Sequence, residues 1–190
     1  MQTNILWTGR EYYSLENCVV SRTDKGTDIN SVIVGRYENK IYRVEYQINT
    51  NANWATTFFE LKTQVSNKRE VLNYQSDGNG NWTKNGKPAR EFQGCIDIDI
   101  PLTPFTNTLP INRLNLSIQE SQQIKVLYLD ILNNEFKPVR QHYKRLSQNE
   151  YKYENVPNDF EATITVDESG LVIDYPELFV RTERQESSYH

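Results

Sequence analysis

Residues 94–114 limit the possible folds of this chain more than any other stretch. Polar and apolar residues alternate from position 95 to position 100, which matches the two-residue period of a β-strand. One face of this strand carries isoleucines, and the other carries Cys95, Asp97 and Asp99. Pro101 and Pro104 then each remove a backbone donor and push the preceding residue toward extended geometry. We therefore expect a strand that ends at residue 100 and a stiff, non-repetitive crossing over residues 101–110.

The rest of the chain favours β-structure. Alanine, the strongest helix former, occurs only at positions 52, 55, 89 and 162, whereas the chain has 12 Tyr and 7 Phe. Aromatic and β-branched residues fit a pleated, half-buried surface. The cleanest alternation in the first half spans residues 40–48, and Asp-Gly and Asn-Gly pairs at 77–78 and 85–86 mark tight turns. We predict an antiparallel, mainly β fold; residues 111–122 fit a short helix and a strand equally well.

The length of 190 residues suits one domain. We assign residues 1–182 to a single barrel-like domain and residues 183–190 to a polar C-terminal tail. A faint internal repeat places Val44–Tyr46 ten residues before Trp54 and Val126–Tyr128 ten residues before Phe136. Alternating patterns also produce such matches by chance, so two similar β lobes remain one of two interpretations.

Charge and cysteine content exclude several function classes. The formal net charge is −4 and no basic stripe is present, so nucleic acid is not an expected partner. Cys18 and Cys95 have neither the spacing of a zinc site nor that of a disulfide framework, and we predict no metal or cofactor. No stretch has the length and apolar content of a transmembrane segment, so we expect a cytoplasmic protein.

Two sets of residues in the central motif could carry chemistry. Cys95 could act as a nucleophile only if the fold brought His142 and Asp97 beside it. Asp97 and Asp99 share a strand face, and paired carboxylates can serve acid/base catalysis, bind a hard metal or bind polar ligand groups. The simpler interpretation is structural: a buried thiol, and carboxylates that pair with turn amides or with Arg113.

Aromatic side chains are the other candidates for a functional site. Most of them would fill the core, and the remainder could line a cavity, because β-barrels of moderate size can hold a ligand inside. The aromatic residues on expected strands or strand ends are Trp7, Tyr42, Tyr46, Trp54, Phe58, Trp82, Tyr128, Tyr143 and Tyr153.

Several motifs follow one another along the chain. They are Gly94-Cys95-x-Asp97-x-Asp99, the run from Thr103 to Leu114, Gln141-x-Tyr143, Tyr151-x-Tyr153, and Val166-Asp167-x-x-Gly170-Leu171-Val172-x-Asp174-Tyr175-Pro176 with Arg181 after it. With these motifs the chain resembles, from Trp7 to Arg181, the bacterial family labelled "putative glycolipid-binding", a former domain of unknown function. It departs from the family pattern at Asn51, Thr57, Asn112 and Glu177.

The resemblance implies an all-β, antiparallel open or half-barrel with at most one or two short helices, similar to the bacterial lipoprotein-carrier barrels. It also implies an internal cavity for a glycolipid or another amphiphilic small molecule, and no catalysis. The competing hypothesis is a small hydrolase or isomerase that uses Asp97 and Asp99, or Cys95. The residues that we expect to bind the ligand are Tyr46, Trp54, Asp97, Asp99, Thr106, Asn107, Arg113, Tyr128, Gln141 and Tyr143.

Overall fold

A computed structural model describes residues 1–187 of the protein, and all strands in it belong to one sheet. The first half contributes β1 (Gln2–Gly9), β2 (Ser14–Thr23), β3 (Gly26–Tyr37), β4 (Lys40–Thr50), β5 (Thr56–Val65), β6 (Lys68–Ser76), β7 (Trp82–Lys84) and β8 (Lys87–Pro88). A 3₁₀ turn, η1 (Arg90–Phe92), β9 (Asp97–Asp99) and the helix α1 (Phe105–Leu114) follow. The second half contributes β10 (Ser121–Asp130), β11 (Glu135–Arg145), β12 (Glu150–Val156), β13 (Glu161–Val166), β14 (Val172–Tyr175) and β15 (Phe179–Ser187).

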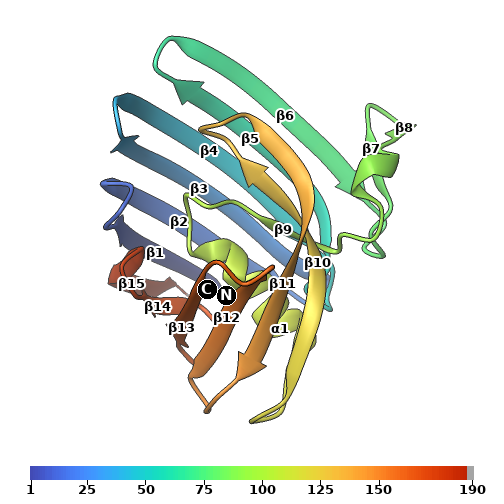
Figure 1. The fold of residues 1–190 in the computed structure, drawn as a ribbon, viewed down its shortest axis with the longest axis vertical. Coiled ribbons are helices and arrows are strands. Elements are labelled where there is room, and N and C mark those ends of the chain that lie inside the picture. Colours follow the sequence, from blue (N-terminus) through green and yellow to red (C-terminus); the bar gives the residue numbers. More distant parts are fainter. Residues whose placement is uncertain (188–190) are drawn as a thin grey trace.

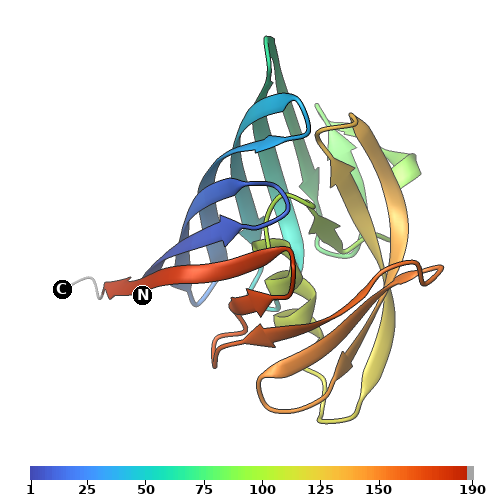
Figure 2. The same ribbon diagram turned by 60° about the vertical axis from the view of Figure 1, so that its left-hand side comes forward.

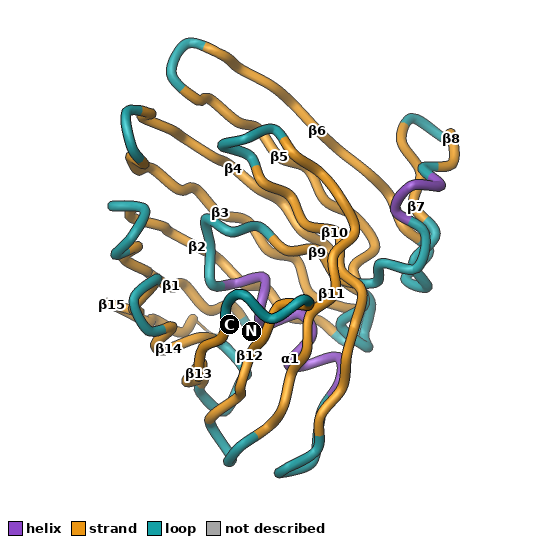
Figure 3. The backbone as a smooth tube through the Cα atoms, in the orientation of Figure 1, coloured by secondary structure: helices purple, strands orange, loops and turns teal. Residues whose placement is uncertain are grey.

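The sheet is strongly curved and open. Its strand order runs from β8 through β1, then from β15 down to β9, so β8 and β9 are the two free edges. Figure 1 shows β1–β6 as one wall of the curve and β10–β13 as the other. In Figure 2 the two walls face each other with α1 between them, and the tube in Figure 3 shows how little of the chain is helical. The prediction of a mainly β, open barrel is confirmed.

Alternation along the strands decides which side chains enter the interior. In β4, Tyr42, Val44, Tyr46 and Ile48 are buried while Ile41 and Arg43 are exposed. β3 pairs with β4 over ten residue pairs from Asp28↔Asn49 to Tyr37↔Lys40, so the same face stays inward across neighbouring strands. The inward face of this wall is therefore set by the two-residue period that the sequence displays.

The buried residues form two clusters. The first covers the inward face of β1–β7 and extends to β9, α1 and β10; it includes Trp7, Phe59 and Phe105. The second lies between β10–β15 and the C-terminal part of α1 and includes Tyr143 and Tyr153. Tyr12 packs against both clusters, in the loop between β1 and β2.

The central stretch differs from the prediction in two ways. The strand is only three residues long, and it pairs in parallel with β10, through Val126↔Asp97 and Tyr128↔Asp99. The expected crossing over 101–110 is wrong from residue 105 onward, because Phe105–Leu114 is an α-helix with Pro110 inside it. Pro104 lies at its N-cap, where the missing N–H costs nothing, and residues 105–111 are all buried by the two walls.

The C-terminal boundary also differs from the prediction. Residues 183–187 continue β15, which pairs with β1 from Gln2↔Ser187 to Gly9↔Phe179. The rest of the expected tail, residues 188–190, lies outside the described residues. Within residues 1–187, no helix combines the length and the apolar character needed to cross a membrane.

Candidate functional site

A pocket of about 620 Å³ opens between β11–β12, the loop that carries Tyr12, and the β14–β15 turn. Its deep end is formed by β9 and the start of α1. The residues that line it are Glu11, Tyr12, Asp99, Pro101, Thr103, Asn107, Tyr128, Asp130, Glu135, Lys137, Val139, Arg140, Gln141, Tyr153, Asn155, Val156, Pro157, Asp159, Phe160, Tyr175, Leu178 and Phe179. Its volume falls in the range of small-molecule sites.

Five polar side chains are hydrogen-bonded to one another at the deep end of this pocket. Gln141 Nε2 donates to Asp99 Oδ2 at 2.6 Å, and Thr106 Oγ1 donates to Asp99 Oδ1 at 3.2 Å. Tyr143 Oη donates to Asn107 Oδ1 at 2.8 Å. β9, β11 and α1 thus each contribute to one hydrogen-bonded floor. Burial raises the pKa of Asp99 to about 6, because its effect is larger than that of the two hydrogen bonds, which lower the pKa.

Aromatic rings form one wall of the pocket. Ring centroids are 6.1 Å apart for Tyr153 and Phe160, 6.2 Å for Tyr153 and Tyr175, and 6.2 Å for Phe160 and Tyr175. Phe179 extends this wall, with its centroid 6.3 Å from that of Tyr175 and 5.9 Å from that of Tyr12. The wall comes from β12, β14, β15 and two loops, so it exists only in the folded chain.

Asp97 has a different role from Asp99 although both face α1. Arg113 Nε donates to Asp97 Oδ1 at 3.0 Å, and Arg113 Nη2 donates to Asp97 Oδ2 at 2.6 Å. The Asp97 side chain is 0% exposed and that of Arg113 is 16% exposed. Burial raises the pKa of Asp97, and Arg113 opposes this shift. The pair fixes β9 to the last turn of α1 and does not line the pocket.

A second buried carboxyl group lies behind the pocket. Glu16 Oε1 accepts hydrogen bonds from Tyr46 Oη at 2.6 Å, Ser31 Oγ at 2.7 Å and Thr103 Oγ1 at 2.9 Å. Phe105 N donates to the same Thr103 hydroxyl at 3.0 Å. Glu16 therefore connects β2–β4 to the first turn of α1. Sequence reasoning missed it, although Glu16 is in phase with the buried Cys18, and that phase would have placed it inside.

The sequence-predicted binding residues fall into three groups. Asp99, Asn107, Tyr128 and Gln141 line the pocket. Thr106 and Tyr143 are buried behind it, and Asp97 with Arg113 forms the neighbouring ion pair. Tyr46 lies in the first core cluster with its hydroxyl on Glu16, and Trp54 packs under Arg22 with 4.7 Å between the guanidinium carbon and the ring centroid. The structure brings eight of them to one region and leaves Tyr46 and Trp54 elsewhere. The part that all ten residues play in binding stays a prediction.

The cysteine residues do not form a nucleophilic site. Cys95 is 0% exposed, and burial raises the pKa of its thiol to about 11, so the reactive thiolate is disfavoured. His142 Nδ1 instead contacts Glu154 Oε2 at 2.9 Å on the neighbouring strand β12. Among residues 1–187, no group of three or more His, Cys, Asp or Glu side chains has the geometry to hold a metal ion.

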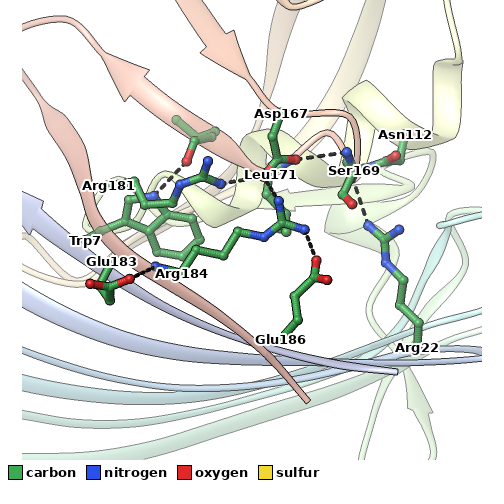
Figure 4. Close-up of polar contacts among 11 residues, drawn as sticks. Trp7, Arg22, Asn112, Asp167, Ser169, Leu171, Arg181, Glu183, Arg184 and Glu186 are labelled. Atoms are coloured by element: carbon green, nitrogen blue, oxygen red, sulfur yellow. Dashed lines mark hydrogen bonds and ion pairs between the residues drawn. The ribbon is translucent and has the colours of Figure 1, made fainter. Parts of the chain in front are cut away.

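A separate polar cluster fixes the turn between β13 and β14 (Figure 4). Asp167 Oδ1 accepts from the backbone N–H groups of Ser169 at 2.9 Å and Leu171 at 3.1 Å. Asp167 Oδ2 accepts a hydrogen bond from Arg181 and forms an ion pair with Arg184 at 3.2 Å. Asn112 Nδ2 donates to Ser169 O at 3.1 Å, which ties the turn to α1. This cluster is away from the pocket and gives the 166–171 part of the motif a structural role, whereas Tyr175 at its end lines the pocket.

The departures from the family pattern have local structural roles here. Asn51 Oδ1 caps its own turn by accepting from the N–H groups of Asn53 at 3.0 Å and Ala55 at 3.1 Å. Thr57 Oγ1 donates to Asn49 O at 3.2 Å. Glu177 has a φ of +66°, a left-handed conformation that glycine adopts more readily.

Comparison with known proteins now identifies the family. The family model described as "Putative glycolipid-binding" matches residues 4–181. This chain belongs to that family. The resemblance inferred from the motifs is therefore confirmed.

Two solved structures resemble this chain. A DUF1089 family protein from Pseudomonas aeruginosa is 33% identical, with a TM-score of 0.78, and the match covers 87% of this chain and 91% of that one. A β-barrel-like protein of the domain of unknown function DUF1849 from Brucella abortus has a TM-score of 0.54 at 10% identity, over 96% of both chains. The second likeness concerns the fold alone. A search of curated proteins finds no match.

Proposed function

We propose that this protein binds an amphiphilic, glycolipid-like ligand, without catalysis, in the pocket lined by β10–β12, the β1–β2 loop and the β14–β15 turn. The observation that carries the proposal is the convergence of Asp99, Asn107 and Gln141 at the deep end of a pocket of about 620 Å³ with an aromatic wall. Carboxylate and amide groups can hydrogen-bond to the hydroxyl groups of a polar head. Aromatic rings supply a large apolar contact area at its side.

The apolar part of the ligand would lie toward the mouth of the pocket. Val139, Phe160 and Leu178 line this part and come from three different segments of the second half. Phe160 is 37% exposed, so part of its ring is available for contact with an apolar chain. The family description gives the same ligand class.

The competing hypothesis of a small hydrolase or isomerase has less support. Cys95 and Asp97 are 0% exposed and do not line the pocket, so only Asp99 of the proposed catalytic groups does. A glycoside hydrolase of the usual kind needs a pair of carboxyl groups on either side of the scissile bond. Because Asp97 is occupied by Arg113, the central motif does not supply that pair.

Native mass spectrometry of freshly purified protein, followed by titration with alkyl glycosides and fatty acids, tests the proposal. We expect a bound amphiphile or measurable binding of at least one alkyl glycoside. Phe160→Ala should weaken that binding about fivefold, because it removes aromatic contact area from the wall. Ile41→Ala is the matched control, since Ile41 is 72% exposed and lies outside the pocket. Absence of binding across the panel would reject the proposal.

A further inference from the structure

The side chains around the pocket carry an excess of negative charge. Five lining residues are acidic (Glu11, Asp99, Asp130, Glu135 and Asp159) and two are basic (Lys137 and Arg140). Lys137 Nζ is already paired with Glu135 Oε1 at 2.7 Å. At close range, charges of one sign that line a cleft attract ligands of the opposite sign.

Asp99 is the carboxylate at the deep end, and only neutral groups stabilise it. Its hydrogen-bond donors are the Gln141 amide at 2.6 Å and the Thr106 hydroxyl at 3.2 Å. Within residues 1–187, Asp99 forms no ion pair, whereas Asp97, two residues earlier on the same strand face, has a bidentate arginine partner. A carboxylate that is half-buried and lacks a cation gains more from a cationic ligand than an exposed one does.

The aromatic wall favours the same ligand charge. Tyr153 and Tyr175 line the pocket together with Phe160, and the faces of such rings attract cations. Burial, with the Asp99 charge as a smaller cause, raises the pKa of both tyrosines well above the usual range, so both phenols stay neutral. The deep end therefore combines one carboxylate with several neutral aromatic rings.

We infer that the head group selected by this pocket carries a positively charged amine, which pairs with Asp99 and packs against the rings of Tyr153 and Tyr175. This inference rests on the proposed function, because it names the chemistry of the head group of the same ligand. An amino sugar or a simple alkylamine head has this chemistry. Head groups with a phosphate, sulfate or carboxylate are disfavoured by the lining carboxylates.

Titration calorimetry with three detergents of equal chain length below their critical micelle concentrations tests the inference. Dodecylamine should bind about tenfold more tightly than dodecyl maltoside, since a charge-assisted contact is roughly twice as strong as a neutral one. Dodecyl phosphate should bind more weakly than the neutral maltoside. Asp99→Asn should bring the affinity for dodecylamine to within about threefold of that for dodecyl maltoside, because it removes the charge while keeping the shape of the side chain and one accepting oxygen. Asp24→Asn, the same change in an exposed turn away from the pocket, should preserve the preference.

The remaining outcomes show whether the amine inference, the amphiphile proposal or both are wrong. Equal affinity for dodecylamine and dodecyl maltoside, or a preference that survives in Asp99→Asn, would overturn the amine inference while the amphiphile proposal stands. Glucosamine, an amine without an alkyl chain, is titrated as a fourth probe. If it binds as tightly as dodecylamine, the amine inference is supported and the amphiphile proposal is overturned. If none of these probes binds, both are rejected.

Discussion

Glu16 is a buried carboxyl group whose second oxygen, Oε2, has no hydrogen-bond partner among the described residues. Three hydroxyl groups, from Ser31, Tyr46 and Thr103, all donate to Oε1. Removal from water disfavours the charged form more than these hydrogen bonds favour it, and the pKa rises from 4.5 to about 7. A single residue therefore couples the attachment of α1 to solution pH.

The raised pKa of Glu16 predicts a stability change with a definite sign. The folded pKa lies above the unfolded one, so the contribution to stability is complete below pH 4.5 and is lost as the pH rises to about 7. The loss amounts to about 3 kcal/mol. Glu16→Gln mimics the protonated form, so its unfolding free energy relative to the natural protein should increase by about 2–3 kcal/mol from pH 5 to pH 8.

Urea denaturation at pH 5 and pH 8 measures this difference directly. Glu168→Gln, at an exposed turn position, serves as the control and should follow the natural protein at both pH values. If Glu16→Gln and the natural protein lose the same stability between these pH values, the Glu16 carboxyl group does not titrate in this range.

At the scale of elements, β9 depends on α1 for its position. It pairs with β10 through three residues only and forms a free edge of the sheet. The second anchor is the ion pair between Asp97 and Arg113, together with the contact of Asp99 with Thr106. The side-chain contacts with α1 therefore hold β9 in place together with its short backbone ladder to β10.

Breaking the Asp97–Arg113 pair should therefore be costly. Asp97→Asn leaves the Arg113 guanidinium largely buried without its counter-charge, and we expect a loss of about 3 kcal/mol in unfolding free energy. Arg113→Gln should cost a similar amount, because it leaves the Asp97 carboxylate unpaired. The double variant should lose clearly less than the sum of the two single losses. Chemical denaturation of the four proteins gives the coupling energy, and additive losses would contradict a direct interaction.

The strands were predictable from sequence in a way that α1 was not. In β4 only one face is buried, which requires apolar residues at every second position, and residues 42–48 show this alternation in the sequence. In α1, residues 105–111 are buried on all sides, so no amphipathic period appears, and Pro110 argues against a helix. The burial of α1 between the two walls stabilises the helix despite the low helix propensity of its sequence. The aromatic wall was equally hidden, because Tyr12, Phe160 and Phe179 lie far apart in the chain.

For the whole molecule, the two core clusters share one hydrogen-bonded sheet. β1 pairs with β15 along its entire length, which joins the first half of the chain to the second. Trp7 Nε1 donates to Val172 O at 2.9 Å, so this hydrogen bond joins a residue of the first cluster to a residue of the second. The ring centroid of Tyr12 lies 5.2 Å from that of Tyr37 and 5.9 Å from that of Phe179.

These connections predict that both halves unfold in one transition. Trp7 and Trp82 belong to the first cluster and Trp54 packs against it, whereas the second cluster contains no tryptophan among the described residues. Tryptophan fluorescence therefore reports on the first cluster, and far-ultraviolet circular dichroism reports on the whole sheet. We expect the two signals to give the same midpoint in urea, as two-state unfolding requires. A fluorescence transition separated from the dichroism transition would mean that the β1–β15 ladder and Tyr12 do not couple the halves, so that one half can unfold while the other keeps its strands.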